Sequence, residues 1–412
     1  MSRCKPKLYV LTVLLIFYSL AGAQTINSVS LLSPTRVNAS QLVIYTYESL
    51  FNDPYYDLIG NFSEVSGIPR DDIQITRLGD ANDIVTRLLL EQSQAQADVV
   101  IGIDNALIHL IENKSQLLEK YTPPNINELD SNLIANLDPE KYLLPYDFGI
   151  IALYYWNTII NSSSYPEIGN ITLDSFLDSD LLSMLIVENP KFSSPGLGFL
   201  LWTIAVFGDP LVDFDGMLKQ DWRTWWRAAN DSLLITRSWG DAFDIFFTPE
   251  ENRPLMVSYG TSPAYGYCQW GDNTTSAIVT HENGMPNAWL QIEGIGLVKD
   301  SPHPANGKAF IDWFLGADLQ SELPEHQWMY PANTEANLST CFQESTIAPE
   351  SVNRLNDLIP PAMLRQHLAY WQDEWEGAIV ETSPGFDTPT TFVIVFLLVI
   401  PILIRRKGKK EL

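Results

Sequence analysis

The chain has 412 residues, of which 46% are hydrophobic, and its formal net charge is −25. A strongly acidic protein repels the phosphate backbone of DNA and RNA, so this charge argues against nucleic acid as a partner. The same charge suits solubility outside a cell and weakly favours a cationic ligand.

Residues 1–23 have the pattern of a secretory signal peptide. Three basic residues precede an apolar run over 8–20, and the small residues 21–23 supply a cleavage position. This order is typical of export signals, and an uncleaved anchor is the alternative. The Ser/Asn/Thr-rich residues 24–40 are predicted to be a linker.

Between residues 41 and 375, strand-like runs alternate with helical patterns, which predicts an α/β fold with a parallel sheet. Strands are expected over 42–47, 72–77, 98–103, 149–156, 185–187, 288–298 and from 255. Helices are expected over 84–90, 195–206, 224–229, 306–319, 361–375 and from Asp104. Asp80 or Asn82 could cap the helix at 84–90, and Ser194 the helix that begins with Pro195.

Aromatic side chains stand where several of these elements begin or end. They are Tyr47, Trp239, Tyr259, Tyr265 and Trp328. In α/β proteins, ligands are contacted at the ends of the elements. Core packing is the alternative for any one of these residues, but the set as a whole favours a binding site.

The C-terminus is predicted to anchor the protein. Residues 379–390 have the composition of a stalk, 391–404 form an apolar transmembrane segment, and 405–412 form a basic cytoplasmic tail. As a helix the segment rises about 21 Å, which is short of a hydrocarbon core. With the preceding Pro384-Gly385-Phe386, it resembles the sorting signals of archaeal surface proteins, in which a lipid can replace the span. The protein is therefore expected at the extracellular face of the membrane.

Cys268 and Cys341 are the two cysteines outside the signal. In an oxidising compartment such a pair indicates one disulfide. The chain also carries eight Asn-X-Ser/Thr sequons, which predict a glycoprotein. Their asparagines are 38, 61, 113, 161, 170, 230, 273 and 337.

The sequence lacks the common signatures of catalysis. Its five histidines are scattered without metal-ligand spacing. Neither a Gly-x-Ser-x-Gly elbow nor a phosphate-cradling glycine loop follows a predicted strand. We therefore expect a binding protein with no catalytic residue, metal or cofactor.

Several segments resemble the thiamine-binding proteins that serve ABC importers, within the class II periplasmic binding protein superfamily. The two most specific are Ser-Ser-Pro-Gly-Leu-Gly at 193–198 and Ser-Tyr-Gly-Thr-Ser-Pro-Ala-Tyr at 258–265. The other matching segments are 45–49, 97–105, 145–149 and 327–331. The resemblance covers about residues 41–375. It implies a two-lobed fold, with 41–147 and 291–378 in one lobe, 148–290 in the other, and crossing strands near 148–155 and 290–296.

The resemblance also implies a ligand site. Its residues would be Tyr47, Asp80, Asp104, Ser193, Ser194, Trp239, Tyr259, Ser262, Tyr265 and Trp328. Aromatic faces suit the flat rings of thiamine, and carboxylates or π-electrons suit its cationic thiazolium. The helix start at Ser193 and Ser194 could bind a phosphate group. Helix capping is the alternative for both serines, for Asp80 and for Asp104, and Asp147 could fix the turn into a crossing strand.

The function implied is capture of thiamine or a thiamine phosphate by a monomeric protein. The ligand would pass to the permease and ATPase subunits of an ABC transporter. A thiaminase I-like enzyme is one alternative, and it would need Cys268 as nucleophile. Another is a binding protein for a different cationic solute or ferric ion, although no histidine lies near the tyrosines. A structural surface adhesin is a third.

Overall fold

The computed structural model describes residues 41–380. The predicted signal peptide, the linker, the transmembrane segment and the tail lie outside the described residues, as does most of the stalk. Within 41–380, none of the helices is both long and apolar enough to cross a bilayer. The sequons at 61, 113, 170, 273 and 337 are exposed, and those at 161 and 230 are partly buried.

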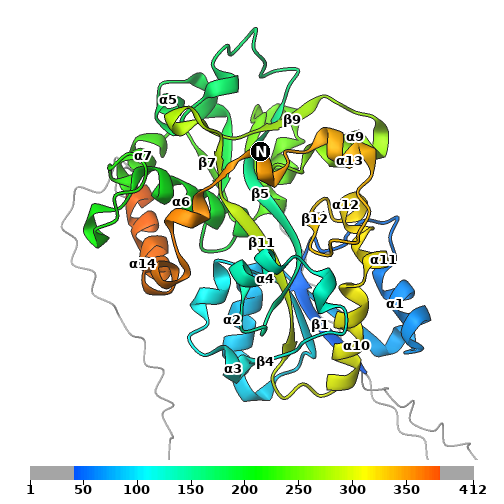
Figure 1. Cartoon of the computed structure of the whole chain (residues 1–412). Helices are drawn as coiled ribbons and strands as arrows, with labels where there is room; N and C mark the ends of the chain where they lie inside the picture. Colours follow the sequence, from blue (N-terminus) through cyan, green and yellow to red (C-terminus); the bar gives the residue numbers. More distant parts are fainter. Residues whose placement is uncertain (1–40, 381–412) are drawn as a thin grey trace, which may run out of the picture. The chain divides into compact units, whose positions relative to one another are not determined.

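One long mixed sheet organises the fold (Figure 1). Its strands follow the order β2 (Ile73–Leu78), β1 (Leu42–Tyr47), β3 (Val99–Asp104), β11 (Leu290–Val298), β5 (Leu144–Trp156), β8 (Leu255–Tyr259), β6 (Leu185–Glu188) and β7 (Leu234–Thr236). Three short strands extend it: β4 (Leu118–Glu119), β9 (Thr275–Ile278) and β12 (Tyr330–Pro331). A separate pair is formed by β10 (Asn287–Ala288) and β13 (Asn353–Arg354).

The expectation of a parallel sheet is only partly right. Strand β1 pairs in parallel with β2 and β3, and β6 pairs in parallel with β7 and β8. Strands β5 and β11 are antiparallel to each other and to their outer neighbours β8 and β3. We call the part around β1–β3 the β1 side of the sheet, and the part around β6–β8 the β6 side.

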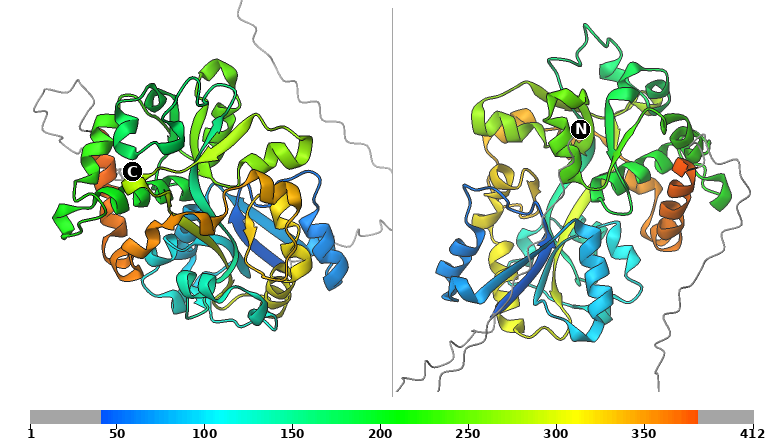
Figure 2. Two further views of the ribbon diagram at one scale, coloured as in Figure 1. Left: turned by 45° about the horizontal axis from the view of Figure 1, so that its top comes forward. Right: turned by 180° about the vertical axis from the view of Figure 1, so that it is seen from behind.

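Two strands connect these sides. Strand β5 pairs with β11 over residues 144–150 and with β8 and β9 over residues 151–156. Strand β11 pairs with β3 over its C-terminal half. Both strands run through the middle of the molecule in each of the views (Figure 2). The chain therefore crosses between the sides on hydrogen-bonded strands.

Helices surround the sheet. They are α1 (Leu58–Ser66), α2 (Ala81–Glu91), α3 (Lys114–Leu117), α4 (Ser131–Leu137), α5 (Leu173–Leu177), α6 (Ser194–Phe207), α7 (Trp222–Ala229), α8 (Trp239–Phe246), α9 (Pro263–Trp270), α10 (Pro304–Phe314), α11 (Ala317–Gln320), α12 (Leu323–His326), α13 (Thr340–Ser345) and α14 (Pro361–Val380). The helix expected from Asp104 is wrong, because only the 3-10 turn η3 (Leu107–Leu110) follows β3.

Helix α6 is buried along its whole length and packs behind the cavity described below. It begins one residue earlier than predicted, so Ser193 holds the N-cap position and Ser194 is already helical. A β-carbon on Gly196 would lie 2.4 Å from the backbone oxygen of Glu188. Glycine is therefore required where the start of α6 meets the end of β6.

Tryptophans build the core on the outer face of the β6 side. Trp222 and Trp226 of α7 are fully buried, as is Trp371 of α14. The rings of Trp226 and Trp375 meet edge to face with centroids 5.6 Å apart. Helix α14 thus packs against α7 and also contacts the turn η3.

Candidate ligand-binding cavity

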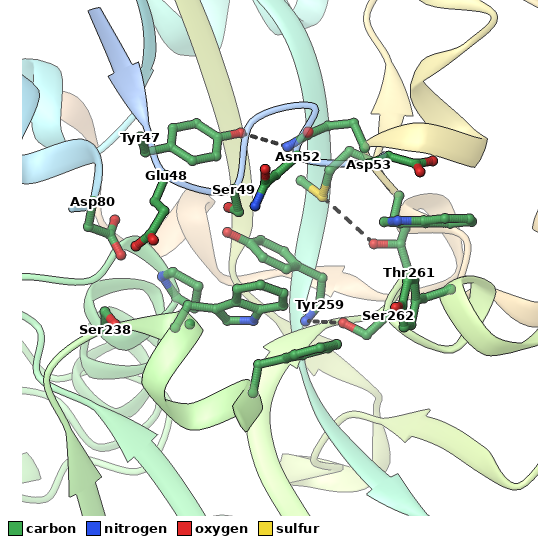
Figure 3. A pocket seen from close by; sticks show the side chains of 18 of the residues that line it. Tyr47, Glu48, Ser49, Asn52, Asp53, Asp80, Ser238, Tyr259, Thr261 and Ser262 are labelled. Carbon is green, nitrogen blue, oxygen red and sulfur yellow. Dashed lines mark hydrogen bonds between the residues drawn. The ribbon is translucent and has the colours of Figure 1, made fainter. Parts of the chain in front are cut away.

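A cavity of about 690 Å³ lies between the β1 side and the β6 side. The β1 side supplies the loop after β1, the start of α2 and the segment before β12. The β6 side supplies the starts of α6, α8 and α9 and the end of β8. Figure 3 shows Tyr47, Asp80, Ser238 and Tyr259 around this space.

One wall of the cavity is a chain of aromatic rings. Trp239 lies 4.8 Å from Phe243, and Phe243 lies 5.9 Å from Tyr265, measured between ring centroids. Tyr265 then meets Trp328 edge to face at 5.5 Å. The indole N–H of Trp239 donates to Ser258 Oγ at 2.9 Å, which fixes the ring. This wall offers half-buried faces for a flat ligand.

Trp328 has an unusual backbone conformation. Its φ is 61°, in the left-handed region that bulky residues rarely adopt. Its amide donates to the carbonyl of Leu323 at 2.8 Å, which holds the turn after α12. Strain of this kind is concentrated at ligand sites, and here it brings the indole to the cavity.

The floor of the cavity is formed by Glu293 on β11. The Tyr47 hydroxyl donates to its Oε2 at 2.9 Å, and the Tyr146 hydroxyl donates to the same oxygen. Gln291 Nε2 donates to its Oε1 at 2.8 Å. Burial raises the pKa of Glu293 to about 7, although the two phenols and the amide favour the ionised form.

Asp80 lies at the start of α2 and faces the start of α6. Its Oδ1 accepts from the amide of Ala81 at 2.7 Å and from the amide of Ser194 at 3.4 Å. Burial raises its pKa to about 7. The hydroxyl of Ser194 donates to Asp104 at 2.6 Å. The start of α6 therefore already faces two carboxylates, whereas the sequence suggested a free position for a phosphate.

Eight of the ten expected site residues line the cavity: Tyr47, Asp80, Ser194, Trp239, Tyr259, Ser262, Tyr265 and Trp328. Asp104 and Ser193 do not, because both are buried behind the lining. Asp80 is also the helix cap that the sequence offered as its alternative, and Asp104 accepts from the amides of Ala106 and Leu107.

Sequence reasoning missed Glu293 and two of the side chains that donate to it, Gln291 and Tyr146. Gln291 and Glu293 belong to β11, and Tyr146 belongs to β5. A signal was available, because polar residues at alternate positions of a buried strand share one face. Carboxylates in such strands are rare unless they have a function.

The lining is acidic. Its carboxylates are Glu48, Asp53, Asp80, Asp241, Asp244 and Glu293. Among the described residues that line it, none is a lysine or an arginine. Its one histidine, His326, contacts Asp53 at 2.6 Å. The lining therefore favours a positively charged ligand.

A disulfide stands beside the aromatic wall. Cys268 of α9 is bonded to Cys341 of α13, and their Cα atoms are 5.4 Å apart. This is the pair that the sequence predicts, and it leaves Cys268 without the thiol that a thiaminase would need. Within residues 41–380, no group of three His, Cys, Asp or Glu residues is arranged to hold a metal ion.

The chain matches the family of bacterial extracellular solute-binding proteins over residues 71–321. It therefore belongs to this family of extracytoplasmic transport components, which are not enzymes and which deliver ligands to ABC transporters.

Among similar proteins, the thiamine-binding periplasmic protein of Brucella melitensis is 26% identical over 349 residues, or 84% of this chain and 94% of that protein. That of Escherichia coli is 25% identical over 75% of this chain and 84% of its own.

Solved structures show the same mixed α/β periplasmic binding protein fold. A periplasmic thiamin binding protein has a TM-score of 0.66 at 24% identity, over 82% of this chain and 96% of that one. A ferric binding protein from Campylobacter jejuni has a TM-score of 0.60 at 19% identity, over 83% and 99%. At these identities the likeness concerns the fold alone.

Proposed function

We propose that this protein captures thiamine in the cavity and passes it to an ABC transporter. The observation that carries the proposal is the pairing of an aromatic wall with six carboxylates. The aminopyrimidine of thiamine needs flat apolar faces, and its thiazolium ring carries a permanent positive charge.

The geometry suggests how the ligand is held. Trp239 and Tyr265 come from the β6 side, whereas Trp328 comes from the segment before β12. A ring stacked on this wall would contact both sides at once. Two lobes, 41–147 with 291–378 and 148–290, would then close on the ligand by bending β5 and β11.

The same lining should also affect the binding of thiamine phosphates. A phosphate group would meet carboxylates, and no described lining residue offers it a cationic partner. The amide of Ser194, which could have bound it, already faces Asp80. We infer that thiamine binds more tightly than its monophosphate.

Ferric ion is the second candidate, because a ferric binding protein shares the fold and three tyrosines lie near Glu293. Iron in proteins is commonly held by phenolates together with His or carboxylate ligands, but within residues 41–380 no group of three His, Cys, Asp or Glu residues is arranged to hold a metal ion. Two of the three tyrosine hydroxyls also donate to Glu293. This arrangement favours an organic cation over iron.

Calorimetry on the purified full-length protein tests the proposal. Thiamine, thiamine monophosphate, spermidine and ferric citrate would be titrated in turn, with chromatography of the recovered ligand. We expect tight binding of thiamine, weaker binding of the monophosphate, and recovery of intact thiamine. Binding of spermidine or iron without any heat from thiamine would replace the proposed ligand.

We also propose that the binding domain faces outward and is tethered by the predicted segment 391–404 or by a lipid that replaces it. Fractionation of cells tests this. A chain truncated after Glu381 should appear in the medium and still bind ligand. Retention of the truncated chain on the membrane would contradict this arrangement.

A further inference from the structure

Four buried carboxylates lie below the cavity, and we call them the acidic floor. They are Asp104, Asp147, Glu188 and Glu293, with exposed fractions of 2%, 0%, 0% and 5%. Asp80 joins them from the cavity edge. The charges of Asp104 and Asp80 act on Glu293 and Glu188 respectively, so the groups are close enough to influence one another.

Within residues 41–380, no lysine or arginine balances the acidic floor. The groups that face Glu293 are phenols from β1, β5 and β8, the amide of Gln291, and further carboxylates. None of the lysines and arginines in the described part of the chain forms an ion pair with a member of the floor. A buried charge without a partner is costly.

Two members of the floor also lack hydrogen bonds. Both carboxyl oxygens of Asp147 and both of Glu188 are buried without a partner. Asp147 stands directly opposite Glu293 in the register of β5 and β11. Side chains paired in this way lie side by side on one face of the sheet. The pairing therefore places Asp147 next to Glu293, and neither of its carboxyl oxygens has a hydrogen-bond partner among residues 41–380.

Burial therefore disfavours the charged form of these acids. Burial raises the pKa of Asp147 well above its ordinary value, and the nearby charge of Glu293 raises it further. Burial likewise raises the pKa of Glu188. Glu293, with a pKa of about 7, is the member that both lines the cavity and titrates near neutrality.

We propose that the acidic floor is a charge-recognition site for a monocation, in which Glu293 releases its proton when the ligand enters. This inference rests on the proposed function, because it takes the ligand to be a cation. The O–H bond of the Glu293 carboxyl breaks and the proton leaves to solvent. Both electrons stay on the carboxylate, whose charge offsets that of the ligand. Asp147 remains neutral behind it.

The linkage between proton release and ligand binding gives the expected pH dependence of the affinity. Below pH 7 the empty site is mostly protonated, so binding must first remove the proton. For one group with a pKa of about 7, affinity should be about tenfold higher at pH 8 than at pH 6. The number of protons released per ligand should fall from about 0.9 at pH 6 to about 0.1 at pH 8.

The test is calorimetry of the full-length protein with thiamine in phosphate and in imidazole, at pH 6, 7 and 8. These buffers differ in ionisation enthalpy, so the difference between the two binding enthalpies counts the released protons. We expect proton release that falls with pH and affinity that rises with it. Equal enthalpies in both buffers, with an affinity independent of pH, would overturn the inference and leave the proposed ligand standing.

Two variants test whether Glu293 is the group that releases the proton. Glu293→Gln keeps the shape and should remove most of the proton release and the pH dependence. Glu64→Gln, the matched control, removes an exposed carboxylate of α1 that lies outside the lining and should retain both. The reverse pattern would overturn the role of Glu293. If Glu293→Gln does not fold, the measurement on the native protein decides. Absence of thiamine binding at every pH would refute both the inference and the proposed function.

Discussion

The pKa values of two buried carboxylates, Asp209 and Glu293, are shifted in opposite directions. Asp209, beside α7, accepts from Arg223 Nη2 at 2.6 Å and from Nη1 at 3.2 Å. The indoles of Trp222 and Trp371 also donate to it. Burial alone would raise its pKa, but these donors more than offset burial, and the pKa of Asp209 is lowered. Glu293 is also buried, but its donors in the described structure are neutral, and its pKa is raised.

The aromatic residues around these two carboxylates differ in the same way. Trp222 and Trp226 are fully buried, and the ring of Trp226 packs edge to face against that of Trp225. Trp239 and Trp328 are half-buried and line an open cavity. A buried acid with its own counterion therefore belongs to the framework, whereas a buried acid beside a cavity and without a counterion is available to a cation from solution.

The largest effect should come from removing the framework counterion. Arg223→Met leaves Asp209 buried and unpaired, so the free energy of unfolding should fall by about 3–5 kcal/mol. Urea denaturation would measure it. Lys219→Met is the control, because Lys219 pairs with Asp215 at the surface and its loss should change stability little. An unchanged midpoint for Arg223→Met would show that the pair does not hold the framework.

The disulfide beside the aromatic wall should contribute to the stability of the protein. Helix α9 carries Tyr265, and a disulfide across 73 residues ties it to α13. Replacing Cys268 and Cys341 together with serine should lower the free energy of unfolding by about 2–4 kcal/mol. Denaturation of the native protein with and without reductant gives the comparison. Mass spectrometry that finds two free thiols in the secreted protein would reject the cross-link.

Glu293 should reduce stability in the empty protein. A carboxyl whose folded pKa is raised contributes stability below its unfolded pKa and loses it as pH rises through the folded value. Here that loss spans about pH 4.5 to 7. Glu293→Gln should therefore stabilise the empty protein at pH 8 by about 1–3 kcal/mol, and it should have little effect at pH 4.

The control for this measurement is Glu48→Gln, which changes an exposed carboxylate. It should leave the pH profile of the melting temperature unchanged. A Glu293→Gln variant that is less stable than the native protein at pH 8 would mean that the phenols stabilise the charge more than burial opposes it.

Loss of one aromatic face should affect binding alone. Trp239→Ala or Trp328→Ala should weaken thiamine binding by about 1–3 kcal/mol, because a desolvated ring loses its stacking partner. Circular dichroism should stay the same. Trp313→Ala, on α10 and outside the lining, is the control for affinity. Unaltered affinity in both cavity variants would remove these tryptophans from the site.

The local sequence determined much of the architecture by itself. The buried strands at 42–47 and 98–103 follow from runs of apolar residues, and the cap at Asp80 follows from its place before a helical pattern. Trp239, Tyr265 and Trp328 of the wall were predicted because they stand at the ends of elements, whereas Phe243 lies inside α8 and was missed. The residues Ala288–Val298 were also predicted to form a strand, although Trp289 separates β10 from β11.

Only the tertiary structure decided which carboxylates are charged. Asp147 and Glu293 are far apart in the sequence and become neighbours through the pairing of β5 with β11. Asp209 contacts Arg223 because the segment between α6 and α7 folds back on itself. It contacts Trp371 because α14 packs against α7. The charge of a buried acid depends on its burial and on the donors around it, and both are set by contacts between distant segments. Local patterns therefore predicted three of the four wall residues, whereas the pairing of Asp147 with Glu293 emerged only when the strands were assembled.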